Sequence, residues 1–143
     1  MAEELRLRLI RKDDAPATNP LGDAFEFGLQ DTKGALAPAH RLTDGRLYWD
    51  FELRVQPGKG GRPNFLGRFA SGPADDRFVY LAWRSIPRGV WINRVKARLA
   101  DIDWPLIEEA QGERAQGRDG RLVADISAWG PGGGRRAVDW RLA

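Results

Sequence analysis

The sequence contains no cysteine, one methionine and one histidine, His40, among its 143 residues. Without cysteine the chain has no disulfide, thiolate metal site or thiol nucleophile, and a single histidine disfavours the usual His/Cys zinc site. No apolar stretch approaches the ~20 residues of a membrane helix, and the first residues, with Glu3 and Glu4, do not resemble a signal peptide. We therefore expect a cytoplasmic protein without membrane association, metal or cofactor.

The sequence also lacks a large excess of charges of one sign. The chain has 23 basic and 20 acidic residues, a formal net charge of +3, and the two signs are interspersed. Because nucleic-acid binding needs clustered cations, this balance disfavours a nucleic-acid partner. The length favours a single domain, residues 1–143, and 17 Gly and nine Pro indicate the many turns of a β-rich protein. Abundant Arg, Ala and Gly also suggest a bacterial source.

Alternating apolar and polar residues predict most of the secondary structure. Residues 5–11, 24–30 and 46–55 each show this pattern, which is longest in residues 46–55. Residues 78–83 are apolar on both faces, so we expect them to form a central strand of a sheet that is covered on both sides. Further extended segments are expected at residues 64–70, 121–129 and 135–142.

One helix has a clear start. Asp103 can cap the first free amide groups, Pro105 is tolerated in the first turn, and we expect Gly112 to end the helix. Residues 91–99 fit either a helix or a strand, and our preferred interpretation is a helical turn near residues 88–93 followed by a strand.

Short turns between strands favour antiparallel neighbours, and Asp44-Gly45 and Asp119-Gly120 are typical of hairpin turns. We therefore predict a mainly β (β-rich α+β) fold, with an antiparallel sheet and one or two short helices. About eight strands can hide their edges by closing into a barrel. We expect a barrel first and a sandwich second.

The residues offer no compelling catalytic group. His40 lies in a Pro/Ala loop, where we expect it to be exposed to solvent. The glycine-rich residues 57–63, with Lys59 and Arg62, could cradle a phosphate but lack the P-loop pattern, so a flexible hairpin loop is favoured. Four pairs of carboxylates could act as acid and base: Asp13 with Asp14, Asp75 with Asp76, Asp101 with Asp103, and Glu108 with Glu109. Turns and helix caps explain most of these pairs.

Polar faces of the strands allow two interpretations. Arg6, Arg8, Asp50 and Glu52 alternate with apolar residues, which indicates an outer sheet face with cross-strand ion pairs. The alternative is the polar lining of a cleft that binds a small ligand. Rings beside arginines also suit single-stranded nucleic acid; the candidates are Tyr48, Trp83, Trp91 and Trp104 with Arg84, Arg88 and Arg94.

Several segments resemble a family of small uncharacterised bacterial proteins, a domain of unknown function. The resemblance rests on residues 28–34, 45–55, 64–73, 77–81, 94–96 and 102–104. The most specific part is the Phe-x-Gly-x-Phe-x-x-Gly-Pro pattern before Arg-Phe-x-Tyr. The resemblance runs from about residue 5 to about residue 110, and the Arg-rich tail fits the family poorly. The resemblance implies a single cytoplasmic domain and carries no function.

We expect a non-catalytic domain that binds a small molecule or a protein partner. The alternatives are an enzyme that uses carboxylates and arginines, and a single-stranded nucleic-acid accessory protein. The oligomeric state stays open. The candidate ligand site joins polar residues that no local turn or cap requires: Gln30, Asp31, Thr32, Lys33, Arg68, Arg77, Arg94 and Lys96.

A structural role is the alternative for two members of this site. Arg68 and Arg77 could brace the Gly72-Pro73 turn through carbonyl groups and Asp75 or Asp76. A ligand site predicts that the candidate residues converge on one concave surface. A structural role predicts that each is already satisfied inside the fold.

Overall fold

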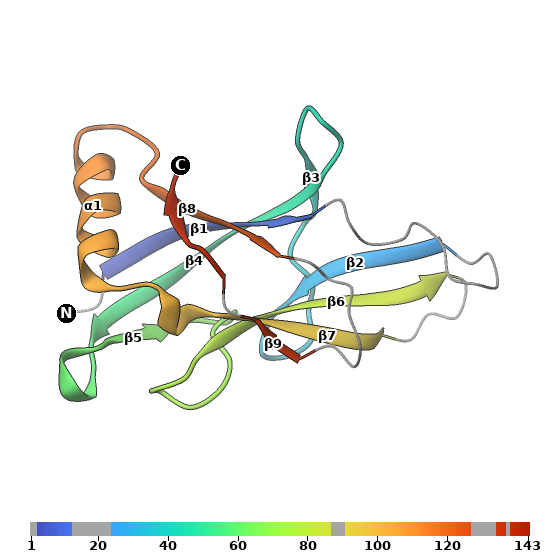
Figure 1. The fold of residues 1–143 in the computed structure, drawn as a ribbon, viewed down its shortest axis with the longest axis horizontal. Coiled ribbons are helices and arrows are strands. Elements are labelled where there is room, and N and C mark those ends of the chain that lie inside the picture. The colour runs from blue at the N-terminus through green and yellow to red at the C-terminus, as the bar shows by residue number, and fades with distance from the viewer. Residues whose placement is uncertain (1–2, 13–23, 87–90, 127–133, 137) are drawn as a thin grey trace.

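The computed structural model describes residues 3–12, 24–86, 91–126, 134–136 and 138–143. These residues form two β-sheets and one α-helix (Figure 1). The larger sheet has six strands in the order β10-β8-β1-β4-β3, with β5 paired to the end of β4. Its strands are β1 (Glu3–Arg11), β3 (His40–Arg41), β4 (Leu47–Pro57), β5 (Pro63–Leu66), β8 (Arg121–Ile126) and β10 (Arg141–Leu142).

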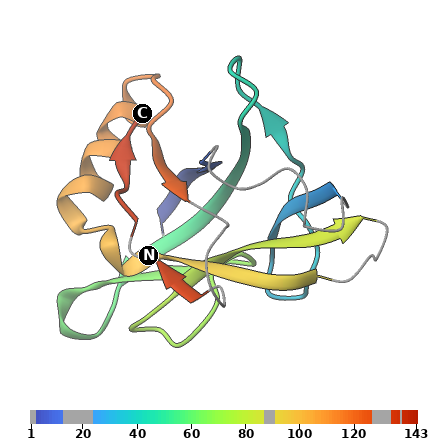
Figure 2. The same ribbon diagram turned by 45° about the vertical axis from the view of Figure 1, so that its right-hand side comes forward.

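The smaller sheet has four strands in the order β2-β6-β7-β9. They are β2 (Ala24–Gln30), β6 (Phe78–Ile86), β7 (Trp91–Arg98) and β9 (Gly134–Arg136). The α1 helix (Trp104–Ala115) contacts β1 and β10 at one end of the molecule, and β2, β6 and β7 extend toward the other end (Figures 1 and 2). Two short 3-10 turns are η1 (Lys59–Gly61) and η2 (Leu99–Asp101). Within the described ranges, no helix has the length and apolar character that a membrane span requires.

The chain passes repeatedly from one sheet to the other. β1 belongs to the larger sheet, β2 to the smaller, β3 to β5 to the larger, and β6 and β7 to the smaller again. Neither sheet closes on itself, since the larger one ends at β10 and β3 and the smaller one at β2 and β9. The described residues therefore form no closed barrel, and the barrel that we expected first is not found. The mainly β class is confirmed. Two strand pairs, β1–β8 and β7–β9, are parallel, so the sheets are mainly rather than wholly antiparallel.

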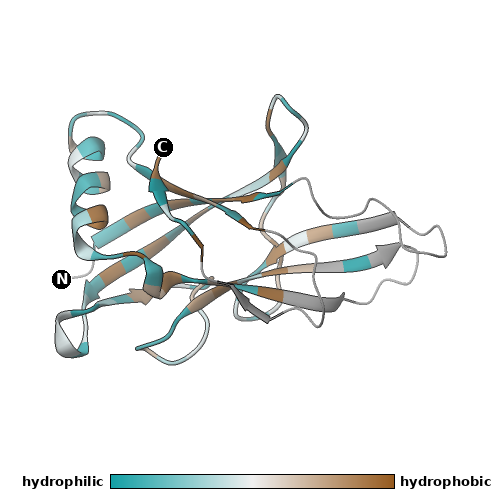
Figure 3. Ribbon diagram, in the orientation of Figure 1, coloured by the Kyte–Doolittle hydropathy of each residue, from teal (hydrophilic) through white to brown (hydrophobic). Residues whose placement is uncertain are grey.

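Both sheets contribute to one hydrophobic core. On β4, the predicted alternation is confirmed, because Trp49, Phe51, Leu53 and Val55 are all buried. In Figure 3, apolar and polar segments alternate along β1 and β4. The core cluster draws on the larger sheet through Leu5, Leu7, Leu9, Trp49, Leu53 and Leu122, and on the smaller sheet through Leu29, Val79, Leu81, Val95 and Ala97.

The prediction of a doubly buried central strand is confirmed for β6. This strand lies between β2 and β7, and both of its faces carry buried side chains: Phe78 on one, and Val79 and Leu81 on the other. Tyr80 is half-buried. An internal strand with two apolar faces is typical of a sheet that is packed on both sides.

The outer face of the larger sheet carries the expected cross-strand ion pairs. Arg8 lies opposite Asp50 in the β1–β4 register, and its Nε lies 2.7 Å from Asp50 Oδ1. Arg121 on β8 reaches the same carboxylate, with 3.3 Å between Nη1 and Oδ2. Such half-exposed pairs each contribute a few tenths of a kcal/mol, roughly, so these residues are explained by the sheet itself.

The start of the helix is confirmed and its end is not where we expected it. The Asp103 carboxylate accepts a hydrogen bond from the Leu106 N–H at 3.1 Å, which is the N-cap interaction. Gly112 lies inside α1, which continues to Ala115. Gly117, with φ +82°, takes the terminating position because its missing Cβ permits the left-handed conformation.

Three further boundaries differ from the sequence prediction. Residues 91–93 belong to β7 and form no helical turn, because pairing with β6 stabilises the extended chain; residues 87–90 lie outside the described residues. β5 covers only the start of residues 64–70. The strand predicted at residues 121–129 is found over the described part of that range, as β8, and residues 127–129 lie outside the described residues. Asp119-Gly120 connects α1 to β8 and is not a hairpin turn.

The tail, residues 135–142, does not form one strand. It contributes β9 to the smaller sheet and β10 to the larger sheet. Between them, the chain is attached to the η2 region by two hydrogen bonds, from the Val138 N–H to Asp101 Oδ2 at 3.0 Å and from Trp140 Nε1 to the Arg98 carbonyl at 2.9 Å. Trp140 points into the core, since it is 7% exposed.

Gly120 is the glycine whose replacement we expect to be most costly. Its φ is +61°, and a Cβ at this position would lie 2.4 Å from the Ala110 carbonyl oxygen of α1. We expect Gly120→Ala to lower the free energy of unfolding by at least about 1–3 kcal/mol, measured by urea denaturation. Gly112→Ala is the matched control: a Cβ there meets nothing within 4 Å, so it should stabilise the helix by ~0.5–1 kcal/mol. Equal effects of the two substitutions would contradict this packing argument.

Candidate functional site

Three polar residues are buried in the part of the chain that the structure describes. Gln30, Asp31 and Ser71 are 6%, 7% and 8% exposed, and all three line one hollow of about 560 Å³. We call it the Gln30 hollow; its other lining residues are Thr32, Gly34, Ala70, Gly72, Arg77 and Tyr80. Because polar side chains are seldom buried, their gathering at one concave surface marks a candidate binding site.

Three segments distant in sequence form the hollow. Gln30 ends β2, where it pairs with Tyr80 of β6 on one side and with Leu36 on the other. Ser71 forms an isolated bridge to Phe78, with both backbone hydrogen bonds at 2.9 Å. The turn after β2 is attached to the loop after β5 by a hydrogen bond of 2.7 Å from the Thr32 N–H to the Arg68 carbonyl.

A close approach at Gly72 keeps this loop against β6. Gly72 has φ +93°, and a Cβ there would lie 2.7 Å from Phe78 Cε1 and 2.9 Å from the Asp76 carbonyl oxygen. Only glycine combines this left-handed conformation with so short a distance. The Gly-Pro turn that the sequence shows therefore has a structural reason, and it determines where Ser71 lies.

Asp31 is fully engaged by its neighbours. Its Oδ1 accepts hydrogen bonds from the N–H groups of Lys33 and Ala35, both at 2.9 Å. Its Oδ2 lies 3.1 Å from Arg68 Nη2 and 3.2 Å from Arg68 Nε. Burial by itself would raise the pKa of Asp31, but the two backbone N–H groups and the Arg68 guanidinium outweigh it and hold the pKa below its ordinary value. Asp31 is therefore an ionised brace for the turn.

Arg77 braces the Gly72 turn and also lines the hollow. Its Nη1 donates to the Gly72 carbonyl at 2.8 Å, and its Nε donates to Asn64 Oδ1 at 3.4 Å. This is the structural role that the sequence left open for Arg77. Arg68 differs, because its partner is Asp31 and not the Gly72-Pro73 turn. A guanidinium has five N–H groups, so these two bonds leave Arg77 further donors.

Ser71 has a buried hydroxyl without a partner. Its Oγ makes no hydrogen bond within the described structure. A polar group buried in this way costs ~1–3 kcal/mol, and such orphaned groups are rare in folded proteins. Ser71 therefore lines the hollow and carries a buried donor and acceptor that the described part of the fold leaves unused.

The candidate residues from the sequence divide into two groups. Gln30, Asp31, Thr32 and Arg77 line the hollow, and Arg68 joins them through its ion pair with Asp31.

Of the other candidates, Lys33 and Lys96 are not among the described lining residues. Lys33 is exposed on the turn, and the Lys96 ammonium lies over the rings of Phe78 and Tyr80, 4.7 and 5.8 Å from their centroids. Arg94 pairs with Ala82 in the β6–β7 register, and its side chain lies outside the described residues.

Sequence reasoning missed Ser71 and Tyr80 as lining residues. A signal was present, since Ser71 is the polar residue of the Phe-Ala-Ser-Gly-Pro segment and Tyr80 is the polar ring of the apolar run at residues 78–83. Neither pattern shows which polar atom ends up without a partner, because that depends on how the loop packs on β6.

Other candidates from the sequence have structural roles. His40 is exposed, as expected, and its ring stacks on Tyr48 with 5.4 Å between centroids. The Trp104 indole donates to the Gly61 carbonyl at 2.7 Å. The side chains of Trp83, Trp91 and Arg94 and all of Asp13, Asp14 and Arg88 lie outside the described residues. In the described ranges, no group of three His, Asp or Glu residues is placed to hold a metal ion.

Comparison with known proteins shows one relationship. The model of a family of unknown function, DUF5990, matches residues 5–142, and the chain belongs to this family. The match extends through the tail, beyond the region near residue 110 where the resemblance from the sequence ended. No curated protein and no solved structure matches the chain.

Asp31→Asn should change stability in a pH-dependent way. The substitution keeps an acceptor for the Lys33 and Ala35 N–H groups and removes the charge that faces Arg68. Because the pKa of Asp31 is lowered by folding, its stabilisation is present above the unfolded-state pKa of about 3.9 and is lost as pH falls through the folded-state pKa. The difference in unfolding free energy between wild type and variant should therefore be constant near neutral pH and shrink below about pH 4.

Urea denaturation between neutral and acidic pH measures this difference. Arg68→Gln is the matched variant, since it removes the other partner, and the double variant should lose little more than either single one at neutral pH. A difference that persists unchanged into strong acid would contradict the assigned role of the Asp31 carboxylate.

Proposed function

We propose that this protein, whose family carries no assigned function, is a non-catalytic binding domain that takes up a small polar molecule in the Gln30 hollow. The observation that carries the proposal is the gathering of Gln30, Asp31 and Ser71 at one hollow, with the Ser71 hydroxyl unpaired. A ligand that bonds this hydroxyl would offset the cost of burying it.

The groups around the hollow indicate the class of ligand. The Ser71 hydroxyl and the Gln30 amide each offer a donor and an acceptor, and the Arg77 guanidinium offers further donors. The Tyr80 ring is half-buried at the wall and supplies an apolar surface. This combination favours a small molecule with hydroxyl, amide or carbonyl groups on a flat or partly apolar body.

Size is consistent with such a ligand. The hollow of about 560 Å³ lies within the range of ~300–1,000 Å³ that is usual for small-molecule sites. Its elements are also tied to one another by the Ser71–Phe78 bridge and the Thr32–Arg68 hydrogen bond, which favours a preformed site and a low ordering cost on binding.

The state of Asp31 favours binding over acid–base catalysis. Asp31 is the carboxylate among the lining residues, and both of its oxygens already accept hydrogen bonds. A general acid or base works best with a pKa near the operating pH, whereas the pKa of Asp31 is lowered. The alternative enzyme that uses carboxylates and arginines therefore gains no support from this hollow.

Ser71→Ala separates a binding role from a structural one. Because the hydroxyl has no partner among the described residues, its removal should leave the unfolding free energy unchanged or raise it by ~1 kcal/mol. The same variant should weaken a bound ligand about tenfold, the loss of one hydrogen bond of roughly 1.4 kcal/mol. Loss of affinity without loss of stability is the signature of a residue kept for binding.

The measurement is a thermal-shift screen followed by amide NMR titration. The panel contains nucleosides, sugars and amino-acid amides, and a hit must shift the amide resonances of Gln30, Ser71 and Tyr80. Thr43→Ala, an exposed residue of the β3–β4 turn, is the control and should change neither property. Two results contradict the proposal: Ser71→Ala destabilises the protein by 1 kcal/mol or more, roughly the value of a made hydrogen bond, or no compound shifts these resonances.

A further inference from the structure

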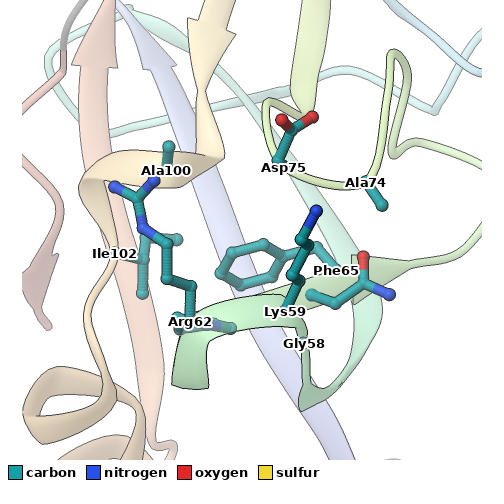
Figure 4. Close-up of a pocket in the computed structure, with 10 residues that line it drawn as sticks. Gly58, Lys59, Arg62, Phe65, Ala74, Asp75, Ala100 and Ile102 are labelled. Atoms are coloured by element: carbon teal, nitrogen blue, oxygen red, sulfur yellow. The ribbon is translucent and has the colours of Figure 1, made fainter.

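A second and smaller pocket lies apart from the Gln30 hollow. It has a volume of about 190 Å³ and shares no lining residue with the hollow. We call it the Phe65 pocket, and Figure 4 shows its lining side chains. The residues that matter for its chemistry are Lys59, Arg62, Phe65, Asp75, Ala100 and Ile102.

The floor of the Phe65 pocket is apolar and belongs to the core. Phe65 on β5 is 3% exposed and Ile102, which follows η2, is 1% exposed. Phe65 is held by the pairing of β5 with β4, opposite Val55. The Ile102 N–H donates to the Leu99 carbonyl at 3.0 Å. The floor is therefore built from two elements that the core already fixes.

The loop that carries the two cations is anchored. The Gly58 N–H donates to the Arg62 carbonyl at 2.7 Å, and the Trp104 indole at the start of α1 donates to the Gly61 carbonyl at 2.7 Å. The sequence favoured a flexible hairpin loop here, and these contacts instead place Lys59 and Arg62 at defined positions. An anchored loop lowers the entropy cost of ordering its side chains around a ligand.

Lys59 and Arg62 lack the carboxylate partners that many, though not all, arginines of the described fold have. Arg8 and Arg68 have carboxylate partners, whereas among the described residues neither Lys59 nor Arg62 has an ion-pair partner within 4.0 Å. In Figure 4, Lys59 and Arg62 rise on either side of the Phe65 ring, and Asp75 lies across the opening. Two cations and one carboxylate leave the mouth of the pocket with a net positive charge.

We propose that the Phe65 pocket binds a small organic carboxylate with an apolar body about the size of a benzene ring. The ring lies against Phe65 and Ile102, and the carboxylate lies between the Lys59 ammonium and the Arg62 guanidinium. An apolar cavity of about 150 Å³ accepts benzene, so a pocket of about 190 Å³ accommodates a ring with the charged group at the mouth. A guanidinium can hold a carboxylate through two parallel hydrogen bonds.

The floor argues against an inorganic anion as the occupant. Phosphate has no apolar surface to place on Phe65, and it is bound in proteins by several converging backbone N–H groups or cations. The η1 turn contains three residues and no helix follows it directly, so the backbone does not supply such a cradle. Affinity here comes from the apolar body and selectivity from the charge.

Four probes test the proposal: benzoate, its neutral isostere benzamide, the cation benzylamine, and inorganic phosphate. We expect benzoate to bind in the millimolar range or tighter, as suits so small a ligand. Benzamide should bind about tenfold more weakly or worse, because it lacks the charge-assisted bonds. Benzylamine and phosphate should not bind here. Binding is measured by amide NMR titration: the amide resonances of Asn64, Phe65 and Ile102 should shift, and those of the Gln30 hollow should not.

Variants of the charged residues at the mouth of the Phe65 pocket test which side chains recognise the carboxylate of the ligand. Arg62→Gln and Lys59→Gln should each weaken benzoate about tenfold or more and leave benzamide unchanged. Asp75→Asn removes a like charge, so benzoate should bind as well or more tightly. Arg54→Gln, an exposed cation on β4, is the matched control and should change nothing. These side chains are exposed, and an unchanged midpoint of urea unfolding shows that each variant is folded.

Three results would overturn the proposal. The first is equal affinity for benzamide and benzoate, because it would mean that the cations do not recognise the ligand. The second is displacement of benzoate by phosphate, because it would mean that the apolar floor does not contribute to binding. Tighter binding of benzylamine, lost in Asp75→Asn, would make this a cation site. None of these outcomes affects the Gln30 hollow, whose test reads different residues.

Discussion

The antiparallel pairing of β1 with β4 is the interaction on which the rest of the structure depends. Its register places Leu5 opposite Leu53, Leu7 opposite Phe51 and Leu9 opposite Trp49, and these six residues are buried. The alternate residues form the ion pairs of the outer face. A slip of one residue would turn the charges into the core, so the pattern allows one register. β8 then adds to β1, and β3 and β5 add to β4.

Both candidate sites lie outside the β1–β4 pair. The segment between β5 and β6 contributes Ser71 and Gly72 to the Gln30 hollow, and Ala74 and Asp75 to the Phe65 pocket. Arg77 connects the two, since it donates to the Gly72 carbonyl and to Asn64 Oδ1, and these two acceptors belong to different pockets. The positive φ of Gly72 is thus a constraint on one loop that shapes two surfaces.

The sequence predicts what local pattern determines and fails where distant pairing decides. The strand at residues 46–55 and the Asp103 cap follow from alternation and from one side chain. Residues 91–98 are a strand because they pair with β6. The tail contributes to both sheets, and Trp140, between β9 and β10, donates a hydrogen bond to the Arg98 carbonyl. Asp31 and Arg68 could both be selected as polar residues, but their ion pair could not be predicted, since only folding brings the two together.

Polar groups that lack a partner inside the fold point to places where a ligand can bind. Most charged side chains of this fold are neutralised by a partner that the sheet register or a cap supplies, as with Arg8 and Asp103. Among the residues that the structure describes, the buried Ser71 hydroxyl has no partner, and Lys59 and Arg62 flank the apolar floor without a counter-ion. Within the described ranges, Trp49 Nε1 and Arg98 Nε are also buried without a partner, but neither residue lines either of the two pockets. Because folded chains satisfy most of their buried polar groups, we propose the unsatisfied groups at the two pockets as the places where a ligand supplies what the fold does not.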